Sequence, residues 1–315
     1  MVEVTRKDVV EAAERIAGAV ERTPFVQSEI NHVFHHLKCE CLQTGGAFKL
    51  RGATNRLLKL SEEERERGVV AFSSGNHARG VAIAAKRLGI RAVIVMPTDA
   101  PAVKVEGTRA EGADIRFYDR KTDSREAIAA AIAAETGATV VPSFDDRDVV
   151  AGQGTVGLEI AAELGDEPSA VVVPCGGGGL ASGIALALPS SRIIAVEPEG
   201  WDDMRRSLEA GAIVAVEDDA PATLCDALQT PRVSPITFGI FQDRGVEVVT
   251  VSDAEVEDAI RFSWKKHKLV VEPGGAVALA AVIAGKVQLE EDSVIVLSGG
   301  NVDPALHARI VGERA

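Results

Sequence analysis

The stretch that decides the fold reads Val171-Val-Val-Pro-Cys-Gly-Gly-Gly-Gly-Leu-Ala-Ser-Gly183. A short run rich in valine ends in four consecutive glycines, Gly176 to Gly179, and a helical pattern follows. Such runs are typical of strands buried in parallel sheets. Glycines let the backbone turn sharply and leave its N–H groups open to an anion, and the helix N-terminus adds a positive dipole end. A tight turn alone would need fewer glycines, so we expect this junction to bind phosphate.

The same alternation of strand and helix runs along the chain. We expect strands at 69–73, 92–96, 115–118, 139–141, 170–174, 192–197, 246–251 and 293–297, and helices that include 77–88, 124–135, 180–187, 253–267 and 275–284. This repeat predicts an α/β fold with parallel sheets. The first helix should begin at Thr5, with Asp8 as its capping-box partner. The charged run 61–68 should be a solvated helix end, and the irregular segment 217–235 should be a loop that lines a site.

Three further junctions combine glycine with polar residues. They read Val70-Ala-Phe-Ser-Ser-Gly-Asn-His-Ala-Arg-Gly80, Val294-Ile-Val-Leu-Ser-Gly-Gly-Asn-Val-Asp303 and Gln43-Thr-Gly-Gly-Ala-Phe-Lys-Leu-Arg-Gly-Ala53. Ligands of open parallel sheets bind at the carboxyl ends of the strands, where such junctions lie. Helix capping by Ser73 does not account for Ser74, Asn76 and His77 together. If Lys49 is buried among its small and apolar neighbours, its pKa is lowered and its amine becomes nucleophilic.

The composition argues against several classes of partner. The net charge of −13 opposes binding to nucleic acid or to anionic membrane surfaces. The chain starts without an apolar signal core and has no apolar run long enough to span a bilayer, so we expect a cytoplasmic protein. Its four cysteines form no C-x-x-C pair and should be reduced.

Together the four junctions resemble the serine/threonine dehydratase and serine racemase family of pyridoxal-phosphate enzymes, called fold type II, which includes 3-hydroxyaspartate dehydratases. The motifs A-F-K-L-R-G-A, S-S-G-N-H, G-G-G-G and S-G-G-N follow in the family's order, and the resemblance extends over residues 5–310. It implies two open, twisted, mostly parallel sheets flanked by helices. It also implies a small mobile domain of residues 44–145, a large cofactor-binding domain of residues 1–43 and 146–315, and a homodimer.

The resemblance implies a role for each matching residue. Lys49 would carry pyridoxal 5'-phosphate as a Schiff base and serve as catalytic base, and Ser74, on the opposite face, would be the second catalytic residue. Ser298 would meet the pyridine nitrogen, where a neutral hydroxyl gives a weaker electron sink than an aspartate and favours rapid loss of a β-leaving group. The other cofactor-binding residues would be Phe48, Asn76, Gly176, Gly177, Gly178 and Gly179, and the substrate-binding residues Ser73, Ser74, Gly75, His77 and Arg125.

A metal site is expected after the tetraglycine unit. Glu197 ends a strand and Asp203 starts the next helix, and such oxygen ligands suit Mg²⁺, Mn²⁺ or Ca²⁺. In the racemase-like branch a similar E-P-x-x-x-x-D segment binds a divalent cation, and the matching positions here are Glu197, the Trp201 carbonyl and Asp203. The alternative is an acidic turn with an N-cap. No metal is expected at His32, His35, His36, Cys39 and Cys41, whose spacing matches no zinc framework.

Arg125 bears on the substrate. It matches an arginine that contacts a second substrate carboxylate in racemase-like relatives, and Arg79 is a further candidate. Two arginines would favour a dicarboxylic substrate such as 3-hydroxyaspartate, whereas the alternative for Arg125 is an exposed helix residue. The chain departs from the family's T-G-S-F-K and D-G-V patterns, because it has Gly45, Ala47 and Ala227 in place of threonine, serine and glycine.

The sequence therefore predicts a pyridoxal-phosphate lyase with a small-molecule amino acid as substrate. The first prediction is a dehydratase, or ammonia-lyase, that converts L-threonine or L-serine to a 2-oxo acid and ammonia by α,β-elimination. Three alternatives stay open: a 3-hydroxyaspartate dehydratase, a serine or other amino-acid racemase, and a non-catalytic pyridoxal-phosphate-binding protein. Few residues follow Asn301, so we expect no C-terminal regulatory domain and a catabolic or racemase-like role.

Overall fold

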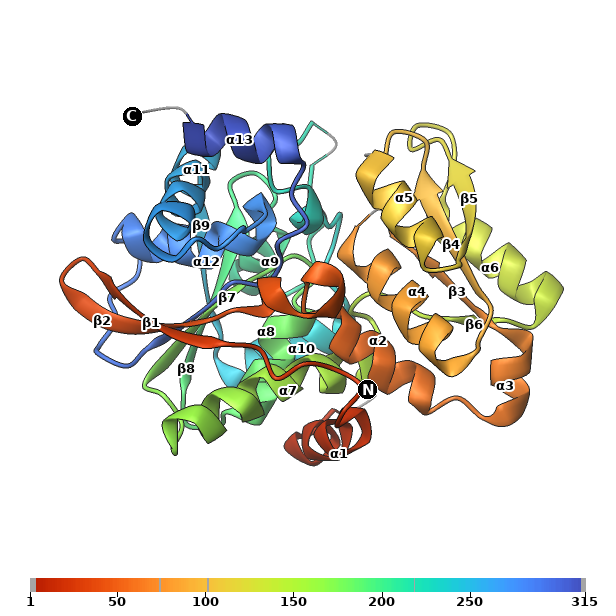
Figure 1. Ribbon diagram of the computed structural model, residues 1–315, viewed down its shortest axis with the longest axis horizontal. Coiled ribbons are helices and arrows are strands. Elements are labelled where there is room, and N and C mark those ends of the chain that lie inside the picture. The colour runs from red at the N-terminus through yellow and green to blue at the C-terminus, as the bar shows by residue number, and fades with distance from the viewer. Residues whose placement is uncertain (1–3, 74, 101, 218, 313–315) are drawn as a thin grey trace.

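The computed structural model describes residues 4–73, 75–100, 102–217 and 219–312, and these form two sheets (Figure 1). The larger sheet has the strand order β1-β2-β10-β7-β8-β9. Its strands are β1 (Phe25–Ile30), β2 (Val33–Lys38), β7 (Ala170–Pro174), β8 (Arg192–Pro198), β9 (Glu247–Val251) and β10 (Val294–Val296). Only the β1–β2 pair within this sheet is antiparallel. The expected α/β fold with mostly parallel sheets is confirmed.

The smaller sheet has the order β5-β4-β3-β6 and is parallel throughout. Its strands are β3 (Val69–Phe72), β4 (Ala92–Pro97), β5 (Asp114–Tyr118) and β6 (Thr139–Val140), and α4 (Asn76–Leu88), α5 (Ala102–Ala110) and α6 (Arg125–Thr136) connect them. All of these elements fall inside the segment 44–145. Whether that segment moves as a separate domain stays a prediction, as does the homodimer.

Helices cover both faces of the larger sheet (Figure 1). They are α1 (Arg6–Ile16), α7 (Arg147–Leu164), α8 (Gly179–Ala187), α9 (Asp203–Ala210), α10 (Pro235–Arg244), α11 (Asp253–Phe262), α12 (Pro273–Ile283) and α13 (Pro304–Gly312). Alternate residues of one strand enter different cores: Val172 packs with α12, whereas Val171 and Val173 pack with α8. Strands buried in this way on both faces have no polar alternation, which is why they read as continuous apolar runs.

Two local expectations about helix ends are confirmed. Thr5 caps α1, and its hydroxyl and the Asp8 carboxylate form the expected capping box. The charged run forms α3 (Glu62–Arg67), which begins after Ser61 and is largely exposed. The helix expected at 253–267 is regular only to Phe262 and continues as a single π-helical turn, Ser263–His267.

The β1–β2 hairpin has no counterpart among the expected strands. His35 and His36 lie on β2, and His32 adopts a left-handed conformation in the turn. Within the described residues, no group of three or more histidine, cysteine or acidic side chains could hold a metal ion. That these histidines and cysteines bind no metal stays a prediction.

The described structure also bears on the compositional expectations. All four cysteines are free and buried. Across the described ranges, no helix has the length and apolar character that crossing a membrane would require. The cytoplasmic location and the absence of nucleic-acid partners stay predictions.

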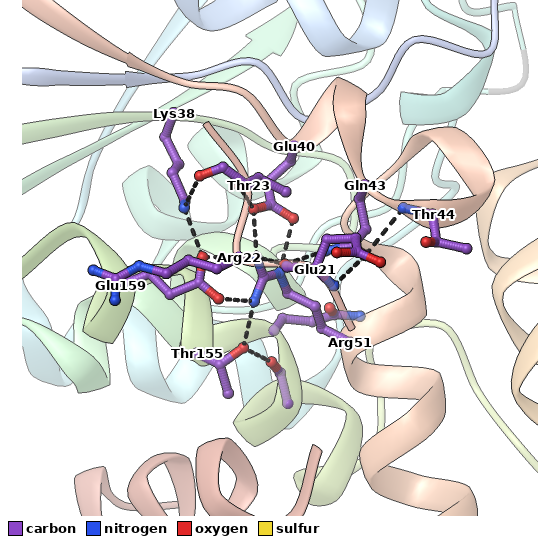
Figure 2. A network of polar contacts seen from close by, with 12 residues as sticks. Glu21, Arg22, Thr23, Lys38, Glu40, Gln43, Thr44, Arg51, Thr155 and Glu159 are labelled. Atoms are coloured by element: carbon purple, nitrogen blue, oxygen red, sulfur yellow. Dashed lines mark hydrogen bonds and ion pairs between the residues drawn. The ribbon is translucent and has the colours of Figure 1, made fainter. Parts of the chain in front are cut away.

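A buried charge network joins α2 (Lys49–Leu58) to the larger sheet (Figure 2). The Arg51 guanidinium donates to both carboxylate oxygens of Glu40, each at 2.8 Å, and to both oxygens of Glu159 at 2.5 and 2.9 Å. Lys38 also donates to Glu159, at 2.6 Å. The side chains of Arg51, Lys38 and Glu40 are fully buried. Charges so enclosed are stable only when every partner is present.

We predict that Arg51→Met lowers the free energy of unfolding by about 3–5 kcal/mol, because it leaves Glu40 buried without a cation. Chemical unfolding of the purified protein measures this. The matched control is Arg91→Met, which breaks the exposed Arg91–Asp114 pair and should cost at most about 1 kcal/mol. Equal effects of the two substitutions would contradict the role given to the network.

Candidate functional site

A cavity of about 500 Å³ lies where the glycine-rich junctions of the two sheets meet. Most of the residues expected at a site line it together: Phe48, Lys49, Ser73, Gly75, Asn76, His77, Arg125, Gly176, Gly177, Gly178, Gly179, Trp201 and Ser298. Ser74 lies outside the described residues. Glu197 and Asp203 are not among the lining residues, and both are fully buried.

Lys49 presents its amine to this cavity from the first turn of α2. Its Nζ donates to the Ser143 carbonyl at 3.1 Å and lies 5.0 Å from the centre of the Phe48 ring. Burial lowers the pKa of the amine from its usual value to about 8. The neutral, nucleophilic form is therefore accessible near physiological pH, as a residue that forms a covalent bond to a carbonyl requires.

The tetraglycine junction is closely packed, and its backbone adopts a conformation that suits glycine. Gly178 caps α8 with a φ of 83°, which favours glycine. A Cβ on Gly177 would lie 2.3 Å from the Phe144 ring, and one on Gly176 would lie 3.0 Å from the Thr230 hydroxyl oxygen. Bare backbone is thus required at the start of a helix, where N–H groups lack helical partners and suit a phosphate. Phe144 carries no sequence signal that would have identified it, whereas Thr230 lies in the loop expected to line a site.

Asn76 is held by two side chains at the cavity wall. Its amide nitrogen donates to Glu272, and its amide oxygen accepts from Asn301 at 2.8 Å. Glu272 is buried, and burial raises the pKa of its carboxyl to about 7. Its second oxygen has no hydrogen-bond partner among the described residues. The sequence did not reveal Glu272, because a Glu-Pro pair before an apolar run is a common helix start.

His77 and Ser298 are both buried in the wall. The Nε2 atom of His77 lies 2.8 Å from the Val141 carbonyl, which can only accept, so this nitrogen carries the proton. Burial lowers the pKa of His77 to about 3, and the ring is neutral at physiological pH. Its Nδ1 therefore offers an acceptor rather than a donor. A direct bond from His77 to a substrate carboxylate stays a prediction that this geometry does not favour.

The backbone accounts for one departure from the family pattern. Gly45 has a φ of 80°, and a Cβ there would lie 2.6 Å from the Cδ1 atom of Ile83. Threonine would be strained at this position, so glycine is the residue that this backbone requires. The Gly45 carbonyl accepts a hydrogen bond from Asn301 at 2.8 Å, which ties this loop to the Asn76 side chain.

Arg125 begins α6 and faces the cavity. Its side chain is 27% exposed, its guanidinium lies over the Phe72 ring at 5.5 Å, and it is paired with Glu126. Arg125 is thus partly enclosed rather than exposed, and its contact with a substrate stays a prediction. Arg79 turns away and donates to Asn301 at 3.0 Å, outside the lining of the cavity. The sequence did not identify the charged lining residues Asp99, Lys104 and Arg120.

The loop over 217–235 contributes to this lining, as expected. Its described residues contain a short 3-10 helix, Asp226–Leu228, and the cavity is lined from Asp226 to Thr230. A Cβ on Gly274 would lie 3.3 Å from the Ala227 methyl group. The methyl group therefore packs closely against the start of α12 at the floor of the cavity.

The expected metal ligands form a compact acidic cluster. Glu197 accepts from the backbone N–H groups of Met204 and Arg205, each at 3.0 Å. Both carboxylate oxygens of Asp203 are buried without a partner among the described residues. Burial raises the pKa of Asp203 to about 7, and burial together with Asp203 raises the pKa of Glu197 well above its usual value. Unsatisfied acidic oxygens of this kind fit a hard cation.

Comparison with known proteins gives a consistent assignment. The family model described as pyridoxal-phosphate dependent enzyme matches residues 16–299. The chain is 45% identical to an L-threo-3-hydroxyaspartate ammonia-lyase of a Pseudomonas species, over 96% of this chain and 97% of the relative. It is 42% identical to the enzyme of the same name from Saccharomyces cerevisiae, over 99% and 97%. The structure of maize serine racemase superposes with a TM-score of 0.92 at 38% identity, covering 97% of this chain and 96% of that one.

The residues of the cavity fit pyridoxal phosphate. Lys49 offers an amine with a lowered pKa, the backbone of Gly176 to Gly179 leaves no space for side chains at a helix N-terminus, and Ser298 supplies a buried hydroxyl. The family match spans most of the chain, and the relatives align over nearly its full length. The chain therefore belongs to the pyridoxal-phosphate dependent enzymes of fold type II, in the group that contains ammonia-lyases and serine racemases.

Proposed function

We propose that this enzyme is a 3-hydroxyaspartate dehydratase, which releases ammonia and a 2-oxo acid with two carboxylates. The proposal rests on Arg125, whose side chain lines the cavity and is only 27% exposed. The names of the two curated relatives support this substrate. The sequence alone favours threonine or serine as the substrate, with 3-hydroxyaspartate as an alternative. The relatives and the position of Arg125 instead support 3-hydroxyaspartate as the preferred substrate.

Arg125 suits a second carboxylate for a physical reason. A guanidinium binds a carboxylate through two parallel hydrogen bonds, and this pairing strengthens when water is excluded. Stacking on Phe72 holds the group in place and leaves its edge for a ligand. Glu126, its present partner, is 57% exposed and can turn into solvent. Threonine and serine have no second carboxylate to replace Glu126.

The chemistry of the proposed reaction is an α,β-elimination. When bound through Lys49, pyridoxal phosphate supplies an acceptor for the electron pair left at the substrate Cα. The Lys49 amine, once the substrate amino group has taken its place, would remove the proton from Cα as general base, and the β-hydroxyl would gain one proton in exchange and leave as water. The enamine that is released reacts with water to give the 2-oxo acid and ammonia. Closure of segment 44–145 over the cavity would exclude bulk water during these steps.

Racemisation is the second candidate. The likeness to maize serine racemase favours it, and Ser74, which lies outside the described residues, would return a proton to the opposite face of Cα. The two activities are separated by following the chirality of the amino acid against the release of keto acid. Binding of the cofactor without turnover is not supported, because Lys49 has both the position and the lowered pKa of a working base.

We also propose that Glu197, Asp203 and the Trp201 carbonyl bind Mg²⁺ or a similar cation. Two buried carboxylates with raised pKa values repel each other, and a cation would relieve that repulsion. Because α9 starts at Asp203 and β8 ends just after Glu197, such an ion would brace the wall to which Trp201 belongs.

We predict that Lys49→Ala abolishes turnover and the visible absorbance of the bound cofactor, because both depend on the Lys49 amine. Absorption spectroscopy and a keto-acid assay measure the two effects. Lys7→Ala removes a lysine that is 85% exposed and should change neither. Turnover that persists in Lys49→Ala would contradict the assignment.

We predict that Arg125→Ala lowers kcat/KM for 3-hydroxyaspartate by about 10- to 100-fold, the range for loss of a hydrogen bond to a charged group. Serine and threonine, measured with the same preparations, control for indirect effects and should lose less. Wild-type enzyme that prefers threonine to 3-hydroxyaspartate, or Arg125→Ala that retains full activity on 3-hydroxyaspartate, would refute the proposal.

We predict that Mg²⁺ raises the thermal midpoint of the wild type by several degrees, because a ligand that binds only the folded state stabilises it. Chelator should lower activity, and added Mg²⁺ should restore it. Asp203→Asn should remove the Mg²⁺-dependent shift, whereas Asp243→Asn, at an exposed position, should keep it. A midpoint and an activity that respond to neither chelator nor Mg²⁺ would exclude the metal site.

A further inference from the structure

An ion pair crosses the cavity between its two walls. Lys104 comes from α5 beside the smaller sheet, and Asp226 comes from the 3-10 helix on the side of the larger sheet. The Lys104 ammonium donates to the Asp226 carboxylate, and both residues line the cavity. Asp226 stands at the aspartate of the family's D-G-V pattern, whereas Lys104 lies outside the motifs on which the resemblance rests. The pair therefore places a cation and a carboxylate inside a substrate site without a role in the reaction described above.

The two partners differ in exposure. The Lys104 side chain is only 11% exposed, whereas that of Asp226 is 43% exposed. An enclosed ammonium has lost much of its hydration and needs an anion beside it, but a half-exposed carboxylate can return to water at little cost. Asp226 is thus the partner that can leave, and Lys104 is the partner that must be paired.

Lys104 also stands next to the loop expected to bind the substrate. A Cβ on Gly75 would lie 3.8 Å from the Lys104 Nζ atom, so the ammonium faces the backbone at the start of α4. Its charge reaches Glu272, where it lowers the pKa against the stronger effect of burial. A substrate carboxylate at the Gly75 loop would leave the other carboxylate of a four-carbon amino acid within reach of Lys104, since only two carbons separate them.

Arg120, which also lines the cavity, is less suited to bind a substrate carboxylate. Arg120 pairs with Asp99 at 2.8 Å, and both of these side chains are about half-exposed or more. Exposed pairs contribute little and are readily screened by salt. Besides Arg125, Lys104 is therefore the lining cation that is both well buried and suitably placed to recognise a second carboxylate.

We propose that Lys104 binds the distal carboxylate of a dicarboxylic amino acid, and that Asp226 occupies its place when no substrate is bound. The inference rests on the proposed function and extends it, because it names a specificity-determining residue and an internal competitor. The contact with Asp226 shows that the Lys104 ammonium can donate to a carboxylate at this point of the cavity. A monocarboxylic amino acid cannot displace Asp226 and gains nothing from Lys104.

Binding of L-aspartate and L-alanine to the holoenzyme tests the proposal, because neither has a β-hydroxyl to eliminate and they differ in the distal carboxylate. The change in visible absorbance on titration gives each Kd. Lys104→Met should weaken aspartate relative to alanine by about 10- to 100-fold. Asp226→Asn should have the opposite effect and tighten aspartate relative to alanine several-fold, and this gain should vanish in the double variant. Lys86→Met, which breaks the Lys86–Glu111 pair outside the cavity, is the matched control and should leave the ratio unchanged.

Two outcomes would overturn the inference. If Lys104→Met weakens both ligands equally, the residue serves the shared α-carboxylate or merely ties the two walls together. If Asp226→Asn weakens aspartate, Asp226 supports the site rather than competing for it. Failure of the proposed function would appear separately, as wild-type enzyme that releases no keto acid from 3-hydroxyaspartate, and it would not alter these binding constants.

Discussion

The position of Lys49 at the cavity depends on the buried Arg51, which follows two residues later in the same helix. Arg51 is fully enclosed and must be matched by Glu40 and Glu159, which come from the segment after β2 and from α7 (Figure 2). A charge in such surroundings permits one arrangement of its partners, because any other leaves an ion desolvated and unpaired. The network therefore fixes the rotation of α2 about its axis. With Arg51 directed to the larger sheet, Lys49 in the first turn faces the cavity.

Glycines also help to fix α2, because they allow its backbone to contact the backbones of neighbouring helices. A Cβ on Gly152 would lie 2.7 Å from the Cα atom of Gly52, so α7 and α2 touch without side chains between them. On the other side of α2, a Cβ on Gly80 would lie 3.1 Å from the backbone of Lys49 and Leu50. Contacts between backbones have no rotamers to change. The start of α2, from which the Lys49 side chain extends, is thus held firmly beside the cavity.

Sequence reasoning succeeded where the signal is local. The valine-rich strands, the Thr5 cap and the four glycine-rich junctions each carry their structural reason in consecutive residues, and all were found. It missed the β1–β2 hairpin, whose strands mix polar and apolar residues and whose turn contains Asn31 and His32 rather than glycine. It also missed Phe144 and Glu272, because their roles arise from contacts between segments far apart in the chain. No pattern of neighbours encodes such a contact.

The charges of the cavity show why pairing, more than net charge, governs what binds there. Enclosure lowers the pKa of Lys49 and raises that of Glu272, so it shifts a base and an acid toward their neutral forms by the same cause. In such surroundings an ion is stable only beside a partner. Arg125 and Lys104 satisfy this condition with Glu126 and Asp226, both of which reach solvent. If a ligand displaces these two carboxylates as we propose, one that brings carboxylates of its own is favoured, because the exchange leaves no cation unpaired.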